Sequence, residues 1–95
     1  MQVEIITPET ILYKGEAEAV QLPGLDGSFQ ILNNHAPIIS GLKEGSVKID
    51  LTTAFVPNEK TSSALSASSN GKVLNVAIKG GVLEFQNNKM IVLAE

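Results

Sequence analysis

The chain has 95 residues, of which 43% are hydrophobic and 18% charged, with a formal net charge of -3, no cysteine and one histidine. This length predicts one domain around a single core, with no room for a large enclosed active site. The composition excludes disulfides and thiolate zinc sites, and a single histidine excludes an all-histidine metal site within one chain.

The charge distribution argues against nucleic acid as a direct partner, and the short apolar runs argue against direct insertion into a membrane. All seven basic residues are lysines scattered singly along the sequence, whereas nucleic-acid binding favours a basic patch with arginine available for bidentate contacts. Residues 1–10 carry two glutamates and no basic residue, which is unlike a signal peptide. Apolar runs are at most five residues long, against the ~20 that a membrane-spanning helix needs. We therefore expect any membrane association to occur through a partner protein.

The hydrophobic pattern predicts strands. Apolar and polar residues alternate in the segments 2–5, 46–51, 74–79 and 83–86, and residues 89–94 are predicted as a final strand. Alternation of this period places one face of a strand on a core and the other in water, as in antiparallel sheets. No segment has the pattern of a helix of convincing length.

Turn-forming residues separate these segments at short intervals. Asparagine and glycine accept the positive φ that tight hairpins require. The predicted turns lie at 13–15, 23–24, 26–27, 33–34, 44–45, 70–71, 80–81 and 87–88. Several short strands with this spacing predict an all-β sandwich or barrel.

One predicted strand departs from strict alternation. The face that carries Glu16 and Glu18 continues into Val20 and Leu22. This change indicates either a bulge near Ala19 or a strand that passes from solvent into a buried environment.

Residues 52–71 form a polar stretch rich in serine and threonine. Within it only 54–56 and 64–65 are apolar enough to be buried. We interpret the stretch as a long hairpin connection with ragged strand ends rather than a functional lid.

Catalytic chemistry has few candidates. His35 lies in the turn-like sequence NNHAP with no local nucleophile and carboxylate, and we interpret it as a loop histidine that bonds to backbone or to a partner protein. Glu16 and Glu18 project from one strand face, where a solvated charge stripe is the simpler interpretation. The loop 23–27 lacks the spacing and the following helix of a phosphate site. The sequence therefore predicts no active site, metal site or cofactor.

Five blocks, in order, resemble the ε subunit of F-type ATP synthase. They are VEIITPE at 3–9, GEAEAVQLPGLDG at 15–27, ILNNHAP at 31–37, LKEGSVKI at 42–49 and GGVLEF at 80–85. The N-terminal domain of that family carries P-G-x-x-G, then I-L-x-x-H-A-P, then a K-x-G turn. The resemblance implies a single domain over 1–95, a ten-stranded β-sandwich of two mostly antiparallel sheets without a C-terminal helical hairpin.

The same resemblance implies a non-catalytic rotor subunit of the central stalk. It would link γ to the c-ring and couple ion-driven rotation to ATP synthesis, as part of the F1 sector on the cytoplasmic face of the bacterial cell membrane. Without the helical hairpin, the chain is expected to lack helix-mediated inhibition and nucleotide binding.

The family's contact surfaces map onto six positions of this sequence. The γ-facing surface of the family corresponds to Thr7, His35 and Ser40. Its c-ring contact loop corresponds to Asp26, Gly27 and Ser28, although an acidic residue is common in the family at the position of Ser28.

Two other hypotheses stay open at the level of sequence. One is a small β-sandwich module that binds a carbohydrate or another small molecule, with the loops 23–28 and 52–71 as its rim. Such sites usually display stacking aromatics, and these loops contain only Phe55. The other is a minor enzyme that uses His35 with a carboxylate.

Overall fold

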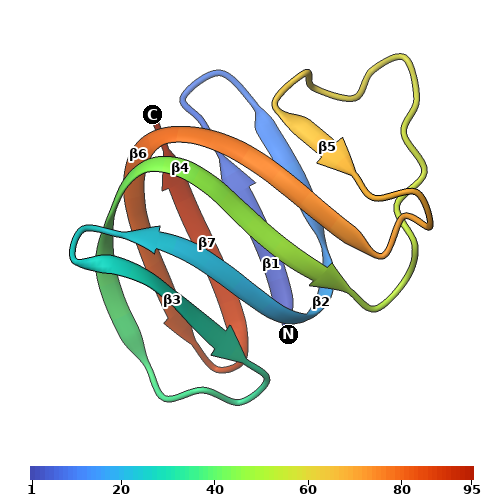
Figure 1. The fold of residues 1–95 in the computed structure, drawn as a ribbon. Helices are drawn as coiled ribbons and strands as arrows, with labels where there is room; N and C mark the ends of the chain where they lie inside the picture. The colour runs from blue at the N-terminus through green and yellow to red at the C-terminus, as the bar shows by residue number, and fades with distance from the viewer.

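Seven strands and no helix make up the computed structural model, which describes all residues 1–95 (Figure 1). The strands are β1 (Gln2–Ile6), β2 (Ile11–Gly24), β3 (Gly27–Leu32), β4 (Ile38–Leu51), β5 (Leu65–Ala67), β6 (Val73–Gln86) and β7 (Lys89–Ala94). The prediction of an all-β chain is confirmed. Strands are fewer than the expected ten because β2, β4 and β6 are each 14 residues long and pass through both layers of the sandwich.

The strands belong to one hydrogen-bonded sheet, in the order β1-β7-β6-β4-β2-β3 with β5 added to β6. Strand β1 also pairs with β2, so the hydrogen bonding returns to its first strand and surrounds the core. All pairs are antiparallel except β1 with β7. Figure 1 shows β4 and β6 curving side by side from one layer to the other. The two expected sheets are therefore two layers of one continuous sheet.

Each layer is named here by one strand that it contains. The β1 layer comprises β1, β7, residues 11–16 of β2, residues 82–86 of β6 and residues 38–42 of β4. The β3 layer comprises β3, β5, residues 17–24 of β2, residues 45–51 of β4 and residues 73–78 of β6.

Strand β6 crosses between the layers at Gly80 and Gly81, whose φ angles are 143° and 152°. Glycine adopts such angles readily, whereas L side chains rarely do. The sequence predicts a turn here, and the positive φ is present, but the strand bends and continues. The turns predicted at 13–15 and 44–45 are likewise wrong because these residues lie inside β2 and β4, and residues 23–24 end β2.

The predicted turns that contain asparagine are confirmed. Asn87 and Asn88 have φ angles of 52° and 57° and join β6 to β7 directly. Positive φ at both central residues is the requirement of a type I′ turn, whose twist matches that of the flanking strands. Asn34 (φ 64°) and Gly71 (φ 73°) take the same region in the turns after β3 and β5.

The core consists of 19 buried hydrophobic residues and contains no buried polar or charged side chain. The alternating positions of β4 and β6 supply its centre, as the pattern predicts. Its fully buried members include Val47, Ile49, Leu74, Val76, Leu83 and Phe85. Each such side chain contributes about 1.5–3 kcal/mol relative to exposure, so apolar burial holds the two layers together.

Strand β2 contains the bulge that its sequence suggests. Its register against β4 shifts between Ala17 and Ala19, so that Glu18 is an extra residue on the β2 side. The side chains of Ala17 and Ala19 are buried, and burial then moves to Val20 and Leu22. After an extra residue of this kind, the positions that pointed to solvent point to the core, which explains the broken alternation.

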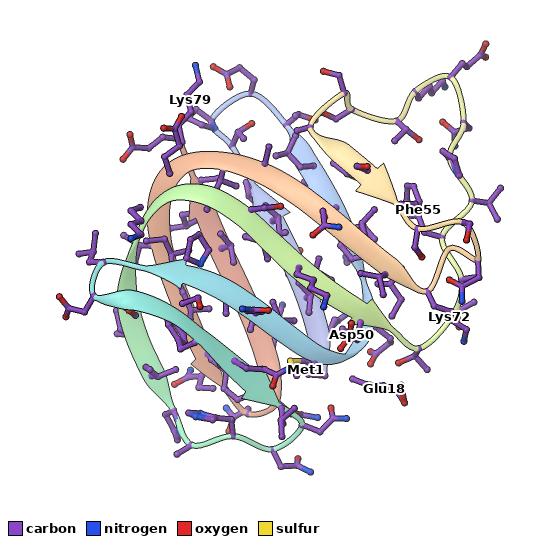
Figure 2. The ribbon with its side chains drawn as sticks, in the orientation of Figure 1. Met1, Glu18, Asp50, Phe55, Lys72 and Lys79 are labelled. Carbon is purple, nitrogen blue, oxygen red and sulfur yellow. The ribbon has the colours of Figure 1, made fainter.

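The polar connection 52–71 contains the short strand β5 and is tied back to the sheet. Phe55 donates its N–H to the carbonyl of Gly71 at 2.8 Å, and Lys72 Nζ donates to the carbonyl of Thr52 at 2.9 Å. Figure 2 shows Phe55 and Lys72 at this end of the molecule. Phe55 packs against the core and meets the ring of Tyr13 edge to face, with centroids 6.1 Å apart. Ala54 and Val56, expected to be buried, are exposed.

The bend in β6 generates a first testable expectation. A Cβ added at Gly81 would lie 2.3 Å from the carbonyl oxygen of Leu93, on a backbone that already disfavours side chains. We expect Gly81→Ala to lower the free energy of unfolding by at least about 2 kcal/mol in urea denaturation. Gly41→Ala is the matched control because its added methyl meets only the mobile end of Leu25. Equal costs for the two variants would contradict this account of the bend.

The environment of Tyr13 generates a second testable expectation. Burial, and then the negative charge of Glu16, raise the pKa of Tyr13 above its ordinary value of 10.0. The chain has one tyrosine and no tryptophan, so the ultraviolet absorbance of tyrosinate reports Tyr13 alone. We expect a titration midpoint above 10.0 in the folded protein, and about 10 in the urea-unfolded chain.

The upward shift of the Tyr13 pKa determines how the stability of the fold changes with pH. A raised pKa in the folded state means that the neutral phenol stabilises the fold fully below pH ~10, and that this contribution is lost as the pH rises through the folded midpoint. Glu16→Gln should lower the midpoint part of the way, and Glu18→Gln should leave it unchanged. A native midpoint at or below that of the unfolded chain would refute the assignment.

Candidate functional site

The outer face of the β1 layer carries a row of exposed apolar side chains. Register places Ile6 opposite Leu93, Leu93 opposite Val82, and Ile6 also opposite Ile11 on β2. Directly paired residues point to the same face of a sheet, so these four side chains form one row across neighbouring strands. The row lies on the side away from the core, because the flanking residues Ile5 and Val92 are fully buried.

Three more apolar residues extend this row into a surface. Ile39 and Ile91 lie two residues from the row along β4 and β7, on the same face. Leu25, at the tip of the β2–β3 hairpin, covers Gly41, which stands opposite Val82. We call the set of seven the apolar band, namely Ile6, Ile11, Leu25, Ile39, Val82, Ile91 and Leu93.

The apolar band concentrates the exposed hydrophobic surface of the molecule. It contains five of the seven large hydrophobic side chains that are exposed. Single exposed apolar residues are ordinary on a protein surface, but a contiguous group marks an interaction site. The band is therefore the candidate functional site of the chain.

The outer face of the β3 layer has the opposite character. Its central row runs through Gln30, Gln21, Lys48, Asn75 and Ser66 on five neighbouring strands. Every member of this row is polar. The molecule thus presents one apolar and one polar sheet face, and only the first has surface that burial against another protein would stabilise.

Charged groups border the apolar band. Lys89 Nζ lies 3.1 Å from Glu4 Oε2, an ion pair between neighbouring strands. This ion pair resembles the polar rim that surrounds the apolar centre of protein interfaces. Glu84, by contrast, is exposed within the band, between Ile39 and Ile91 in the register.

The structure places the three predicted γ-contact residues along the β1 layer without joining them into one cluster. Thr7 follows β1, and its hydroxyl donates to the carbonyl of Thr10 at 3.2 Å. Ser40 lies in β4, opposite Leu83, half-buried and facing the core. β1 and β4 are three strand spacings apart in this layer, roughly 14 Å. Thr7 and Ser40 therefore lie on opposite sides of the apolar band.

His35 lies in the exposed loop between β3 and β4. Its Nδ1 is 2.7 Å from the carbonyl oxygen of Ala36, and its ring meets Phe85 edge to face with centroids 6.1 Å apart. Asn34 anchors the loop by donating its N–H to Asn88 Oδ1 at 2.7 Å. No carboxylate lies within ion-pair distance of His35, so the arrangement of an acid–base pair is not present.

The three predicted c-ring contact residues share one place in the fold. Asp26, Gly27 and Ser28 are all exposed at the tip of the β2–β3 hairpin. Gly27 has a φ of 126° and open space around it. The hairpin tip lies beside Ser40 and Gly41 across an open cleft of about 410 Å³. The predicted contact surfaces for the two partners therefore adjoin each other at β4.

The arrangement of loops does not favour the small-molecule hypothesis. The largest cleft, about 490 Å³, is lined by the 52–71 connection alone, with Phe55 as its one aromatic. The loop 23–28 borders a different cleft, and the two clefts share no residue. The single rim expected from sequence is thus absent. The structure also contains no group of three side chains that could hold a metal ion, and no helix suited to crossing a membrane.

Sequence reasoning did not identify the apolar band, although a signal for it exists. Consecutive apolar residues in a strand place one side chain on each face. Consecutive apolar residues occur at 5–6, 38–39, 82–83 and 90–94. These stretches supply Ile6, Ile39, Val82, Ile91 and Leu93 to the band, and their remaining residues are buried or half-buried.

Comparisons with known proteins agree with one another. The family described as the β-sandwich domain of the ATP synthase delta/epsilon chain matches residues 1–56. An ATP synthase epsilon chain from Chlorobium limicola is 34% identical over 94 residues, which cover 99% of this chain and 88% of that protein. One from Desulforamulus reducens is 31% identical over 94 residues, but the chain spans only 58% of its length.

A solved structure shares the fold. It is a chain in the cryo-EM structure of the central stalk and c-ring of the mitochondrial ATP synthase from Tetrahymena thermophila. The TM-score is 0.69 with 18% identity, and the match covers 99% of this chain and 62% of that one.

Proposed function

The chain belongs to the family of ATP synthase delta/epsilon chain β-sandwich domains, and from this premise we propose that it is a central-stalk subunit of an F1Fo ATP synthase, linking γ to the c-ring. The predicted resemblance is thereby confirmed, and with it the prediction of a subunit that is not itself catalytic. In this proposal the chain turns with γ and the c-ring and couples ion flow to ATP synthesis. It would lie in the F1 sector, on the cytoplasmic face of a bacterial cell membrane.

The observation that carries the proposal is the contrast between the two sheet faces. A subunit held between other proteins needs at least one surface that is more stable when covered, and the apolar band is such a surface. We assign γ to this band and to the positions beside it, Thr7 and Ser40, with His35 at the end of the same layer. We assign the c-ring to the exposed hairpin tip, Asp26, Gly27 and Ser28.

Binding of γ tests the first assignment. Leu93→Asp and Ile39→Asp place a charge in the apolar band at exposed positions, so the fold should tolerate them. We expect each to weaken binding to the purified γ subunit of the same synthase by at least about tenfold, because the charge must be desolvated on docking. Isothermal titration calorimetry gives the affinity, and urea denaturation checks that the fold is intact.

Gln30→Asp is the matched control because it adds the same charge on the polar face. Thr7→Glu and His35→Glu test the positions taken from the family. Unchanged γ affinity in the Leu93 and Ile39 variants would remove γ from the apolar band. Unchanged affinity in the Thr7 and His35 variants alone would limit the contact to the band.

Binding of the c-ring tests the second assignment. Asp26 is the one charged residue of the hairpin tip, and its carboxylate has no ion-pair partner in the chain. We expect Asp26→Lys to weaken binding of the γ-bound chain to detergent-solubilised c-ring by about tenfold at low salt, with a smaller effect at high salt where charges are screened. Asp50→Lys, on the β3 layer, is the control. An effect equal to that of the control would place the c-ring contact elsewhere.

A further inference from the structure

We propose that Leu25 connects the two contact surfaces, so that docking of γ on the apolar band fixes the hairpin tip in the position from which it meets the c-ring. This inference rests on the proposed function and adds a mechanism to it. Leu25 belongs to both surfaces, because it is next to Asp26 in the hairpin tip and is also a member of the band. A single side chain therefore lies where the two partners would meet.

The side chain of Leu25 leaves its own hairpin and lies on β4. A Cβ added at Gly41 would be 2.8 Å from Leu25 Cδ1 and 3.4 Å from Cγ. The absence of a side chain at Gly41 thus provides the space that Leu25 occupies. Since Gly41 stands opposite Val82, this position continues the apolar band as far as the hairpin.

Few other interactions hold the hairpin tip. Strand pairing ends at Gly24 with Gly27, and the one side-chain hydrogen bond is that from Gln21 Nε2 to Ser28 Oγ, long at 3.4 Å. The open cleft between the tip and residues 40–41 leaves space into which the tip can move. Gly24 pairs with Leu42 at the base of the tip. Beyond that pair, the contact of Leu25 with Gly41 ties the tip to the β1 layer.

Leu25 itself is 64% exposed, so most of its surface is available to a partner. A protein seated on Val82 and Leu93 reaches Leu25 without a gap, and it would hold the leucine against Gly41 from the outside. In this proposal γ covers the surface with apolar side chains. A second copy of the chain fits it less well, because both copies carry a net charge of -3 and an exposed Glu84 within the band.

Three variants test the coupling, with amide hydrogen exchange at 26–28 and c-ring affinity measured with and without γ. In the original chain, we expect γ to slow exchange at the tip at least about fivefold and to raise the affinity for solubilised c-ring. Leu25→Ala should abolish both effects of γ and weaken γ binding about three- to tenfold. Gly41→Ala should displace Leu25 and reduce both effects.

Leu32→Ala is the matched control, because Leu32 is a similarly exposed leucine at the other end of β3, outside the band. It should leave both effects of γ unchanged. If Leu25→Ala keeps the slowed exchange and the gain in c-ring affinity, the coupling is wrong while the proposed function stands. If the original chain does not bind γ, the proposed function fails, and this inference fails with it.

Discussion

The antiparallel pairing of β4 with β6 is the interaction on which the rest of the structure depends. The two strands keep one register, without a shift, from Ile38 opposite Phe85 to Asp50 opposite Val73. Because both strands bend together between the layers, one set of hydrogen bonds supports both halves of the sandwich. The core forms between the two arms of this bent pair, and the neighbouring strands add to its edges. Substitutions at the bend therefore affect both layers at once.

This arrangement also explains why the outer faces differ. In the β1 layer, strands such as β7 are apolar on both sides, so one set of side chains fills the core and the other forms the apolar band. In the β3 layer the strands alternate, and their outer row is polar. A continuous sheet thus joins a surface suited to burial with a surface suited to water. The family to which the chain belongs is one of subunits in a multi-protein enzyme, where such a division is useful.

Much of the fold could be predicted from local patterns. Alternation in β4 and β6 identified buried residues correctly because a strand with one face in water has a clear period of two. Asn87 with Asn88 predicted the hairpin through backbone chemistry alone. The bends could not be predicted, since Gly80 and Gly81 have the same composition whether a strand reverses or only changes direction. That choice depends on the partner strand, which lies far away in sequence.

The candidate site was less accessible to sequence reasoning. The positions of Thr7, His35 and Ser40 came from the resemblance, and nothing local indicated that Ser40 faces the core. The apolar band is built from five strands and one hairpin tip, so its continuity exists only in the register between strands. The contact of Leu25 with Gly41 likewise joins residues that no periodic pattern connects. Surfaces of this kind require the topology before they can be recognised.

The double pairing of β1 has a mechanical consequence. By bonding to β7 on one side and to β2 on the other, this short strand closes the wall of the sandwich around its axis. A tube with a closed wall resists torsion far better than the same tube slit along its length, because shear stress can then circulate around the whole section. The five residues of β1 thus close the wall of the sandwich and make it more resistant to twisting. Loss of their pairing would open this wall and also withdraw Val3 and Ile5 from the core.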